Sequence, residues 1–160
     1  MLNPIDTAAV IRDGGATGTH PGQIHTGVAW WLGSCLVTTR GANRAVVGHD
    51  GHPVSIEYAD RFARGTVNSH HYRCRTTVLT IAVDEQSLLD FRADVSAVGA
   101  YITTNADNIV TIALYDVLGE RLTDRSGLDR IRALIDADRV PIPVNDAARG
   151  TIDRYEGTPR

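Results

Sequence analysis

The stretch Gly99-Ala-Tyr-Ile-Thr-Thr-Asn-Ala-Asp-Asn108 begins as a short apolar run and passes into a loop of small polar side chains. A second run rich in β-forming residues, Ile109-Val-Thr-Ile-Ala-Leu114, follows directly. This pattern predicts a strand, a loop and a second strand. Polar loops held by a sheet are common ligand sites, but Asn and Asp also form ordinary turns. The local pattern leaves both alternatives open.

The composition is that of an ordinary globular protein. The chain has 160 residues, of which 42% are hydrophobic and 22% are charged, so one domain can bury its own core. The net charge of −3 provides no basic surface, and we therefore expect neither nucleic acid nor a membrane as a partner. All sixteen basic residues are arginine, which excludes catalysis by a lysine Schiff base.

The sequence contains no recognisable export or membrane segment. The longest apolar run, Val28–Leu32, is far too short to span a bilayer. The N-terminus lacks the basic region and apolar core of a secretory signal. Without export, Cys35 and Cys74 are expected to be free, buried thiols. We therefore predict a cytoplasmic location.

Helix-type and strand-type patterns alternate along the chain. Ala8–Ile11 predicts a strand, and the glycine-rich segment Arg12–Gly22 predicts a long ordered loop. Apolar residues between Val28 and Leu36 fall on one helical face. Further helices are predicted after Gly51, over Glu85–Val95 and after Ser126 as a capping residue, and further strands over Arg44–Asp50 and Cys74–Val83.

This order of elements predicts an α/β domain over residues 1–138, a three-layer α/β/α sandwich with a mixed, mostly parallel sheet. Residues 139–160 are polar and contain prolines, which is typical of a linker or docking tail. Right-handed crossovers place strand-to-helix loops at one sheet edge. We therefore expect Arg12–Gly22, Gly48–Pro53 and Thr103–Asn108 to meet there, where open α/β sheets bind ligands.

The side chains expected at this edge are polar or titratable. The turn His49-Asp-Gly-His52 could supply an acid/base pair, two metal ligands or plain helix-capping groups. No Cys or Glu lies nearby to complete a zinc site, so we expect no metal and no other cofactor. We assign catalysis to His49, His52 and Asp107, and binding of a small-molecule substrate to Asp13, Thr17, His20, Asp50, Thr103, Thr104 and Asn105.

Four parts of the chain match the motifs of one known family. Arg12–Ile24 resembles an opening arm, KAYDVRG followed by a YPDQL-like segment, and Val46–Ser55 resembles the turn VVGRDxRxSS. Glu57–Gly65 resembles a helix, ELAxAFAxG, and Tyr101–Asn108 falls where the family has its active loop, TASHNP. The family is that of the phosphohexomutases, the phosphomannomutase/phosphoglucomutase enzymes. The resemblance to their first domain spans residues 8–136 and implies its fold.

The resemblance also implies that the family's chemistry is lost. That chemistry needs a phosphorylated serine in the active loop, a Mg²⁺ held partly by a DGDGD loop, and three further domains that we do not expect here. By position, the serine is Asn105 and the loop proline is Asn108. An Asn side chain is not a nucleophile under ordinary conditions. Three family arginines are replaced by Thr17, His49 and His52, which weakens the attraction for phosphate.

Two hypotheses follow for this stand-alone, degenerate phosphomannomutase-like protein. The first is a repurposed small-molecule enzyme of isomerase, cyclase or lyase type in specialised-metabolite biosynthesis, using acid/base and hydrogen-bonding groups at the former active edge. The alternative is a non-catalytic binding or regulatory module that acts through a protein partner. Docking would then involve the helix around Trp30 or the C-terminal tail, and a homodimer is compatible with either hypothesis.

Overall fold

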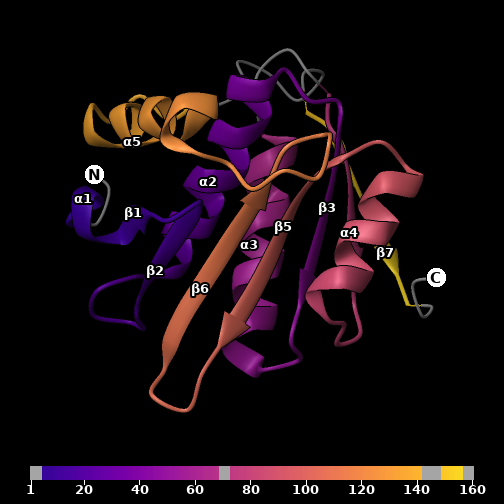
Figure 1. Ribbon diagram of the computed structural model, residues 1–160, viewed down its shortest axis with the longest axis horizontal. Coiled ribbons are helices and arrows are strands. Elements are labelled where there is room, and N and C mark those ends of the chain that lie inside the picture. Colours follow the sequence, from indigo (N-terminus) through magenta and orange to yellow (C-terminus); the bar gives the residue numbers. More distant parts are fainter. Residues whose placement is uncertain (1–4, 69–72, 142–148, 157–160) are drawn as a thin grey trace.

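The computed structural model describes residues 5–68, 73–141 and 149–156. They form a seven-stranded mixed sheet with helices on both faces (Figure 1), which confirms the expected α/β fold. The strands are β1 Ile11–Arg12, β2 Gly15–Thr19, β3 Arg44–His49, β4 Arg75–Leu79, β5 Val98–Thr104, β6 Ile109–Tyr115 and β7 Thr151–Tyr155. The helices are α1 Thr7–Val10, α2 Thr26–Arg40, α3 Pro53–Val67, α4 Glu85–Asp94, the π-helical turn η1 Asp124–Leu128 and α5 Asp129–Asp136.

The sheet has the strand order β1-β2-β6-β5-β3-β4-β7. Strands β5, β3, β4 and β7 run parallel to one another. Strands β6, β2 and β1 extend the sheet with antiparallel pairings. The β5–β6 hairpin, predicted from its two β-rich runs, therefore lies at the junction of the parallel and antiparallel parts.

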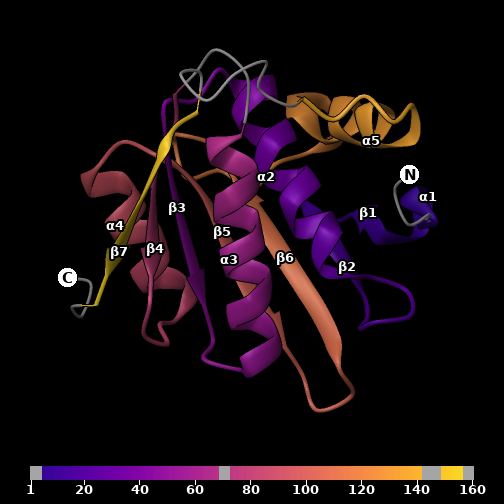
Figure 2. The ribbon, with the colours of Figure 1, turned by 180° about the vertical axis from the view of Figure 1, so that it is seen from behind.

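Helices α2 and α3 pack side by side on one face of the sheet (Figure 2), and α4 lies on the other. The larger core lies under α2 and α3 and includes Leu32, Phe62 and Ile102, whereas a smaller core under α4 includes Leu79 and Leu88. Among the described residues, no helix covers the α4 side of β2 and β6 (Figure 1). None of the described helices is long and apolar enough to cross a membrane.

Helices α2 and α3 touch backbone to backbone through two glycines. A Cβ atom at Gly33 would lie 2.3 Å from the Phe62 carbonyl oxygen, and one at Gly65 would lie 2.0 Å from the Trp30 carbonyl oxygen. Neither distance is possible for a real side chain. The absence of side chains at these positions therefore fixes how closely the two helices approach.

The helix predictions hold well because they rest on local signals. Helix α2 buries the predicted apolar face and ends at Gly41, whose φ of 60° is the left-handed conformation of a C-terminal cap. Helix α3 follows Gly51 as predicted and begins with Pro53 at its first position. It buries Phe62, whereas Ile56 in its first turn is 45% exposed.

Some local expectations are wrong. Ala8–Ile11 was predicted as a strand, but most of it belongs to α1. The predicted loop Arg12–Gly22 contains β2, which pairs with β6. The last helical segment is capped by Thr123 rather than Ser126, and the Ser126 side chain closes the capping box from the third position.

The C-terminal segment is more ordered than a linker. Strand β7 pairs in parallel with β4 over its whole length, Thr151 to Tyr155, and forms an edge of the sheet. The expectation of an unpacked tail is therefore wrong for these residues, while the boundary between residues 138 and 139 stays a prediction. Cys35 and Cys74 are free and buried, as expected, and burial raises the pKa of the Cys35 thiol to about 12.

Candidate functional site

Three segments meet at the carboxyl edge of the parallel strands, at the lower end of Figure 1. They are the β5–β6 loop, the β3–α3 turn and the connection between β2 and α2. The backbone N–H of His20 donates to the Asn108 carbonyl over 2.8 Å. The Thr104 N–H donates to Asp50 Oδ2 over 2.9 Å. These contacts confirm that the hairpin loop and its neighbours form one edge.

The hairpin loop is a closed turn held by Asn105. Its Oδ1 accepts hydrogen bonds from the N–H groups of Asp107, over 2.9 Å, and Ile109, over 3.0 Å. Asn108 completes the turn with a φ of 59°, a left-handed conformation that Asn tolerates. Asn105, which the sequence resemblance aligns with the phosphohexomutase serine, therefore offers no hydroxyl. Its side-chain amide oxygen already accepts two backbone N–H groups.

Asp50 connects the β3–α3 turn to the end of β5. Besides the Thr104 N–H, it accepts the His52 N–H over 3.0 Å at Oδ1. The buried Ser55 hydroxyl also hydrogen-bonds to it and lies 2.7 Å from the Thr104 hydroxyl. Burial raises the pKa of the Asp50 carboxyl, but these hydrogen bonds outweigh burial and hold the pKa below its ordinary value. Asp50 is thus a structural link in this edge.

The two histidines of the turn are fixed by their own backbone. Nδ1 of His49 accepts the Gly51 N–H over 3.0 Å, and Nδ1 of His52 accepts the Val54 N–H over 3.1 Å as the N-cap of α3. His49 is only 2% exposed. Burial lowers its pKa despite the charge of Asp50 and a hydrogen bond to the Leu79 backbone. This geometry matches the helix-capping alternative for the pair.

His20 has a different partner. Its Nδ1 lies 2.7 Å from the hydroxyl oxygen of Tyr58, a fully buried residue of α3. Burial first, and then the charge of Glu57, raise the pKa of that phenol. Nε2 is the ring nitrogen of His20 that this contact leaves for a ligand. Sequence patterns do not single out Tyr58, although its spacing of three from Ser55 puts both residues on one face of α3.

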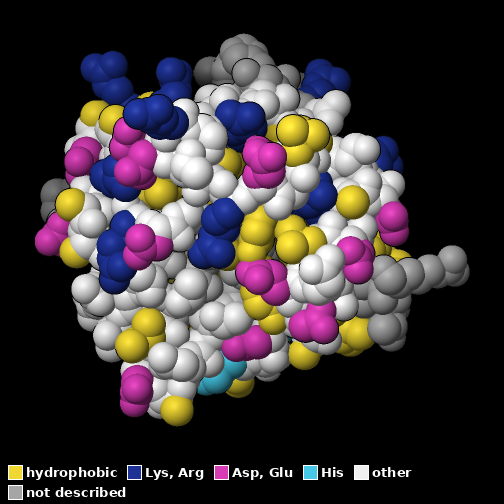
Figure 3. Space-filling model, viewed as in Figure 1, with side chains coloured by type: hydrophobic (Ala, Val, Ile, Leu, Met, Phe, Trp, Pro, Cys, Tyr) yellow, Lys and Arg dark blue, Asp and Glu magenta, His cyan; other side chains and the backbone are white. Residues whose placement is uncertain are grey.

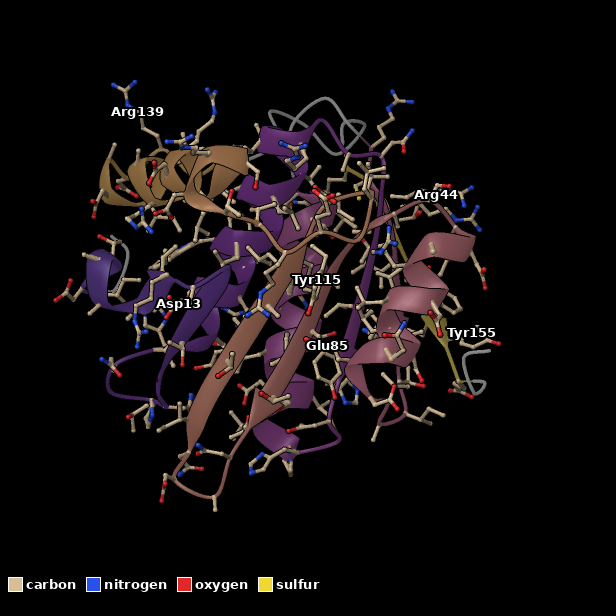
Figure 4. All side chains as sticks on the ribbon, in the orientation of Figure 1. Asp13, Arg44, Glu85, Tyr115, Arg139 and Tyr155 are labelled. Atoms are coloured by element: carbon tan, nitrogen blue, oxygen red, sulfur yellow. The ribbon has the colours of Figure 1, made fainter. Side chains whose placement is uncertain are left out.

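One predicted binding residue, Asp13, lies away from the edge. The register of β2 with β6, Gly15 opposite Ala113 and Thr19 opposite Ile109, carries Asp13 to the far end of these strands. There the backbone carbonyl of Asp13 accepts a hydrogen bond from Arg121, and Figure 4 shows Asp13 at the left of the molecule, above the lower edge. The expectation that all of Arg12–Gly22 reaches the edge is therefore wrong.

The remaining predicted residues differ in their surroundings. Thr17 lies within β2, and its hydroxyl oxygen is 3.4 Å from that of Thr111. Thr103 is half-buried opposite Thr111 in β6, Thr104 is buried, and Asp107 is exposed on the hairpin loop. Within the described residues, no group of three or more His, Cys, Asp or Glu side chains is placed to hold a metal ion.

The charge of this edge does not suit a phosphate dianion. None of the four connections there, residues 20–25, 50–52, 80–84 and 105–108, contains an arginine. They do contain Asp50, Asp84 and Asp107. Arginine provides the strong, forked hydrogen bonds that most phosphate sites use. The groups available for a ligand are instead imidazole, amide, hydroxyl and carboxylate.

Two solved structures of phosphoglucomutase or phosphomannomutase proteins have a similar fold. A phosphoglucomutase/phosphomannomutase family protein from Burkholderia thailandensis matches with a TM-score of 0.75 and 14% identity over 96% of this chain. A protein from Thermus thermophilus, classed as a phosphomannomutase, matches with a TM-score of 0.66 and 20% identity over 98% of this chain. This chain spans 34% of the length of each. No protein-family model and no curated sequence matches.

Proposed function

We propose that this protein is a small-molecule enzyme on a phosphomannomutase-like fold that does not transfer phosphoryl groups. Its carboxyl edge would bind an uncharged, hydroxylated molecule and act on it by acid/base chemistry. The reaction would be an isomerisation, cyclisation or elimination in a biosynthetic pathway. The fold is shared with the two solved structures, whereas the reaction is inferred from the groups at the edge.

The loss of phosphoryl transfer is supported by the hairpin loop. Asn105 provides no nucleophilic oxygen, and its amide closes the turn. The absence of arginine from the four connections at this edge removes the groups that would neutralise a phosphate. Substituting a serine for Asn105 would restore a hydroxyl but would supply no cation.

The His20–Tyr58 pair is the single observation that carries the acid/base proposal. A tyrosine hydroxyl can donate to Nδ1 or accept from it, so Tyr58 supports both neutral tautomers of the imidazole. Nε2 can then release a proton or take one up without the ring turning. An imidazole that a buried partner orients in this way is well placed for general acid–base catalysis. His20 therefore replaces His49 and His52 as the preferred catalytic group.

A ligand screen followed by a turnover assay tests this proposal. We expect hydroxylated, uncharged compounds to raise the melting temperature more than the corresponding hexose phosphates do. With a compound that is turned over, His20→Gln should lower kcat by about a hundredfold or more, the usual contribution of a general acid or base. Tyr58→Phe keeps the ring and removes the hydroxyl, and should lower kcat by about tenfold.

Tyr115→Phe is the matched control, because it removes a phenol on the opposite, α4 face of the sheet, where the Tyr115 hydroxyl donates to Glu85. It should leave turnover unchanged. A stronger response to hexose phosphates than to their uncharged parents would contradict the proposed ligand class. Equal turnover by wild type and His20→Gln would contradict the role of His20.

A second candidate function is a binding module that acts through a protein partner. It is favoured by the β6–η1 connection, where Leu118 is 76% exposed and Val117 is 48% exposed. Trp30, the docking residue expected from the sequence, is less exposed than Leu118: it is half-buried, beside the buried Trp31. A Leu118→Asp variant that lost a co-purifying partner while keeping its fold would support this candidate over the enzyme.

A further inference from the structure

A hollow of about 200 Å³ lies at the amino edge of the parallel strands, opposite the candidate site. The segment Arg40–Arg44, which connects α2 to β3, forms one wall, and Ser96, Val98 and Val117 complete the lining. Figure 3 shows dark-blue arginine side chains gathered along this upper edge, and Figure 4 labels Arg44 there.

The two arginines of the hollow have no acidic partner among the described residues. Arg40 donates to the Ser126 carbonyl over 2.8 Å, which holds its guanidinium in place, and the Arg44 side chain makes no hydrogen bond or ion pair with the described residues. Arg44 also borders a neighbouring hollow, where the carboxylate of Asp153 is paired with Arg75 over 2.8 Å. The chain has nineteen acidic and sixteen basic residues, so a shortage of carboxylates does not explain the unpaired arginines.

Two helices end beside this hollow, and the carbonyl groups of a helix C-terminus normally repel anions. Here three of those carbonyls already accept backbone N–H groups. The N–H groups of Gly41 and Ala42 donate to Thr38 and Val37 at the end of α2. The N–H of Ser96 likewise donates to a carbonyl in the last turn of α4. Arg40 and Arg44 add two positive charges beside these helix ends.

Part of the lining is apolar. Ala42, Val98 and Val117 provide it, and none of the lining residues is acidic. A volume of this size accommodates a molecule of roughly ten non-hydrogen atoms, well below the range of drug-sized pockets. The site therefore combines two cations with a small apolar surface.

We propose that this hollow binds a small organic anion, a carboxylate or a phosphate monoester on a short apolar body. The anionic group is held between Arg40 and Arg44, and the apolar body lies against Val98 and Val117. Guanidinium groups form charge-assisted hydrogen bonds with both kinds of anion. The ligand is distinct from the uncharged molecule proposed for the carboxyl edge, so each proposal can fail without the other.

Heteronuclear NMR titrations of the full chain test this site. The probes are benzoate and phenyl phosphate, with benzyl alcohol as an uncharged analogue. We expect saturable shifts of the amide signals of Gly41–Arg44 and Ser96 with one or both anions and none with benzyl alcohol. Arg44→Ala should weaken binding about tenfold, as expected for the loss of one charge-assisted hydrogen bond. Arg44→Lys should weaken it less, because it keeps the charge but not the forked geometry.

Arg154→Ala is the matched control, since Arg154 is a surface arginine paired with Asp60 over 2.8 Å. It should leave the affinity unchanged. The proposal is overturned if neither anion binds at about 10 mM, a concentration at which even millimolar affinity is visible. It is also overturned if the uncharged analogue binds equally well, or if the Arg44 and Arg154 variants lose the same affinity, which would indicate a general charge effect.

Discussion

Removing the carboxylate of Asp50 should destabilise the whole carboxyl edge, because this side chain joins two segments of the chain. It accepts the N–H groups of Thr104 and His52 over 2.9 and 3.0 Å. Hydrogen bonds to charged groups contribute about 1.5–3 kcal/mol each when buried. Asp50 is half-exposed, so in the variant water will replace part of the lost hydrogen-bond energy. We therefore expect Asp50→Ala to cost about 2–4 kcal/mol of unfolding free energy.

Asp50→Asn offers a graded comparison. The asparagine keeps one acceptor oxygen but turns an NH₂ group toward the second backbone N–H, so the expected cost is about 1–2 kcal/mol. Asp107→Ala removes an exposed carboxylate from the same edge and should change stability by less than about 0.5 kcal/mol. Urea unfolding followed by circular dichroism measures all three variants.

The effect of Asp50 should also depend on pH. Because its folded-state pKa is lowered, its stabilising contribution is complete above the ordinary aspartate pKa of 3.8 and is lost as pH falls through the lower folded value. The difference in stability between wild type and Asp50→Asn should therefore shrink in acid. An Asp50→Ala variant as stable as Asp107→Ala would refute the structural role of this residue.

Two further predictions concern other parts of the fold. His49→Asn should reduce the loss of folding stability between about pH 7 and about pH 5. Because the pKa of His49 is lowered in the folded state, the stability that its neutral ring contributes is present above pH 6.5 and is lost below it, whereas Asn does not titrate and can still accept the Gly51 N–H. Urea midpoints equal to those of wild type at both pH values would contradict this. Gly33→Ala should lower the unfolding free energy by about 1–3 kcal/mol, because it forces α2 and α3 apart. Gly22→Ala should not lower it, because no atom lies within 4 Å of the added carbon. Thermal unfolding compares the two variants.

Sequence patterns predicted the helices and strands whose formation depends on residues near one another in the chain. Helix α2 follows from its apolar spacing and from Gly41 at its end. The β5–β6 hairpin follows from two β-rich runs around a polar turn. Strand β2, by contrast, reads as a loop because it is built of Gly, Ala and Thr. It is a strand because β6 lies beside it, and a Cβ atom at Gly15 would lie 1.8 Å from the Ile112 carbonyl oxygen.

The candidate site was predictable as an edge but not residue by residue. The meeting of the hairpin loop with the β3–α3 turn follows from parallel pairing of β3 and β5. The separation of Asp13 from that edge depends on the antiparallel register of β2, which leaves no local signal. The contrast between His49, whose Nδ1 holds a backbone group, and His20, whose Nδ1 meets the Tyr58 phenol, also depends on tertiary structure.

The claim that this phosphomannomutase-like fold has lost phosphoryl transfer is tested most directly by measuring covalent phosphate on the protein. The chain is incubated with radiolabelled hexose phosphates and Mg²⁺, and bound label is measured after denaturation. We predict no label on the wild type, which has Asn105 in place of the serine, and none on Asn105→Ser, because the edge connections still contain no arginine to neutralise the phosphate. Stoichiometric labelling of the wild type would contradict this account.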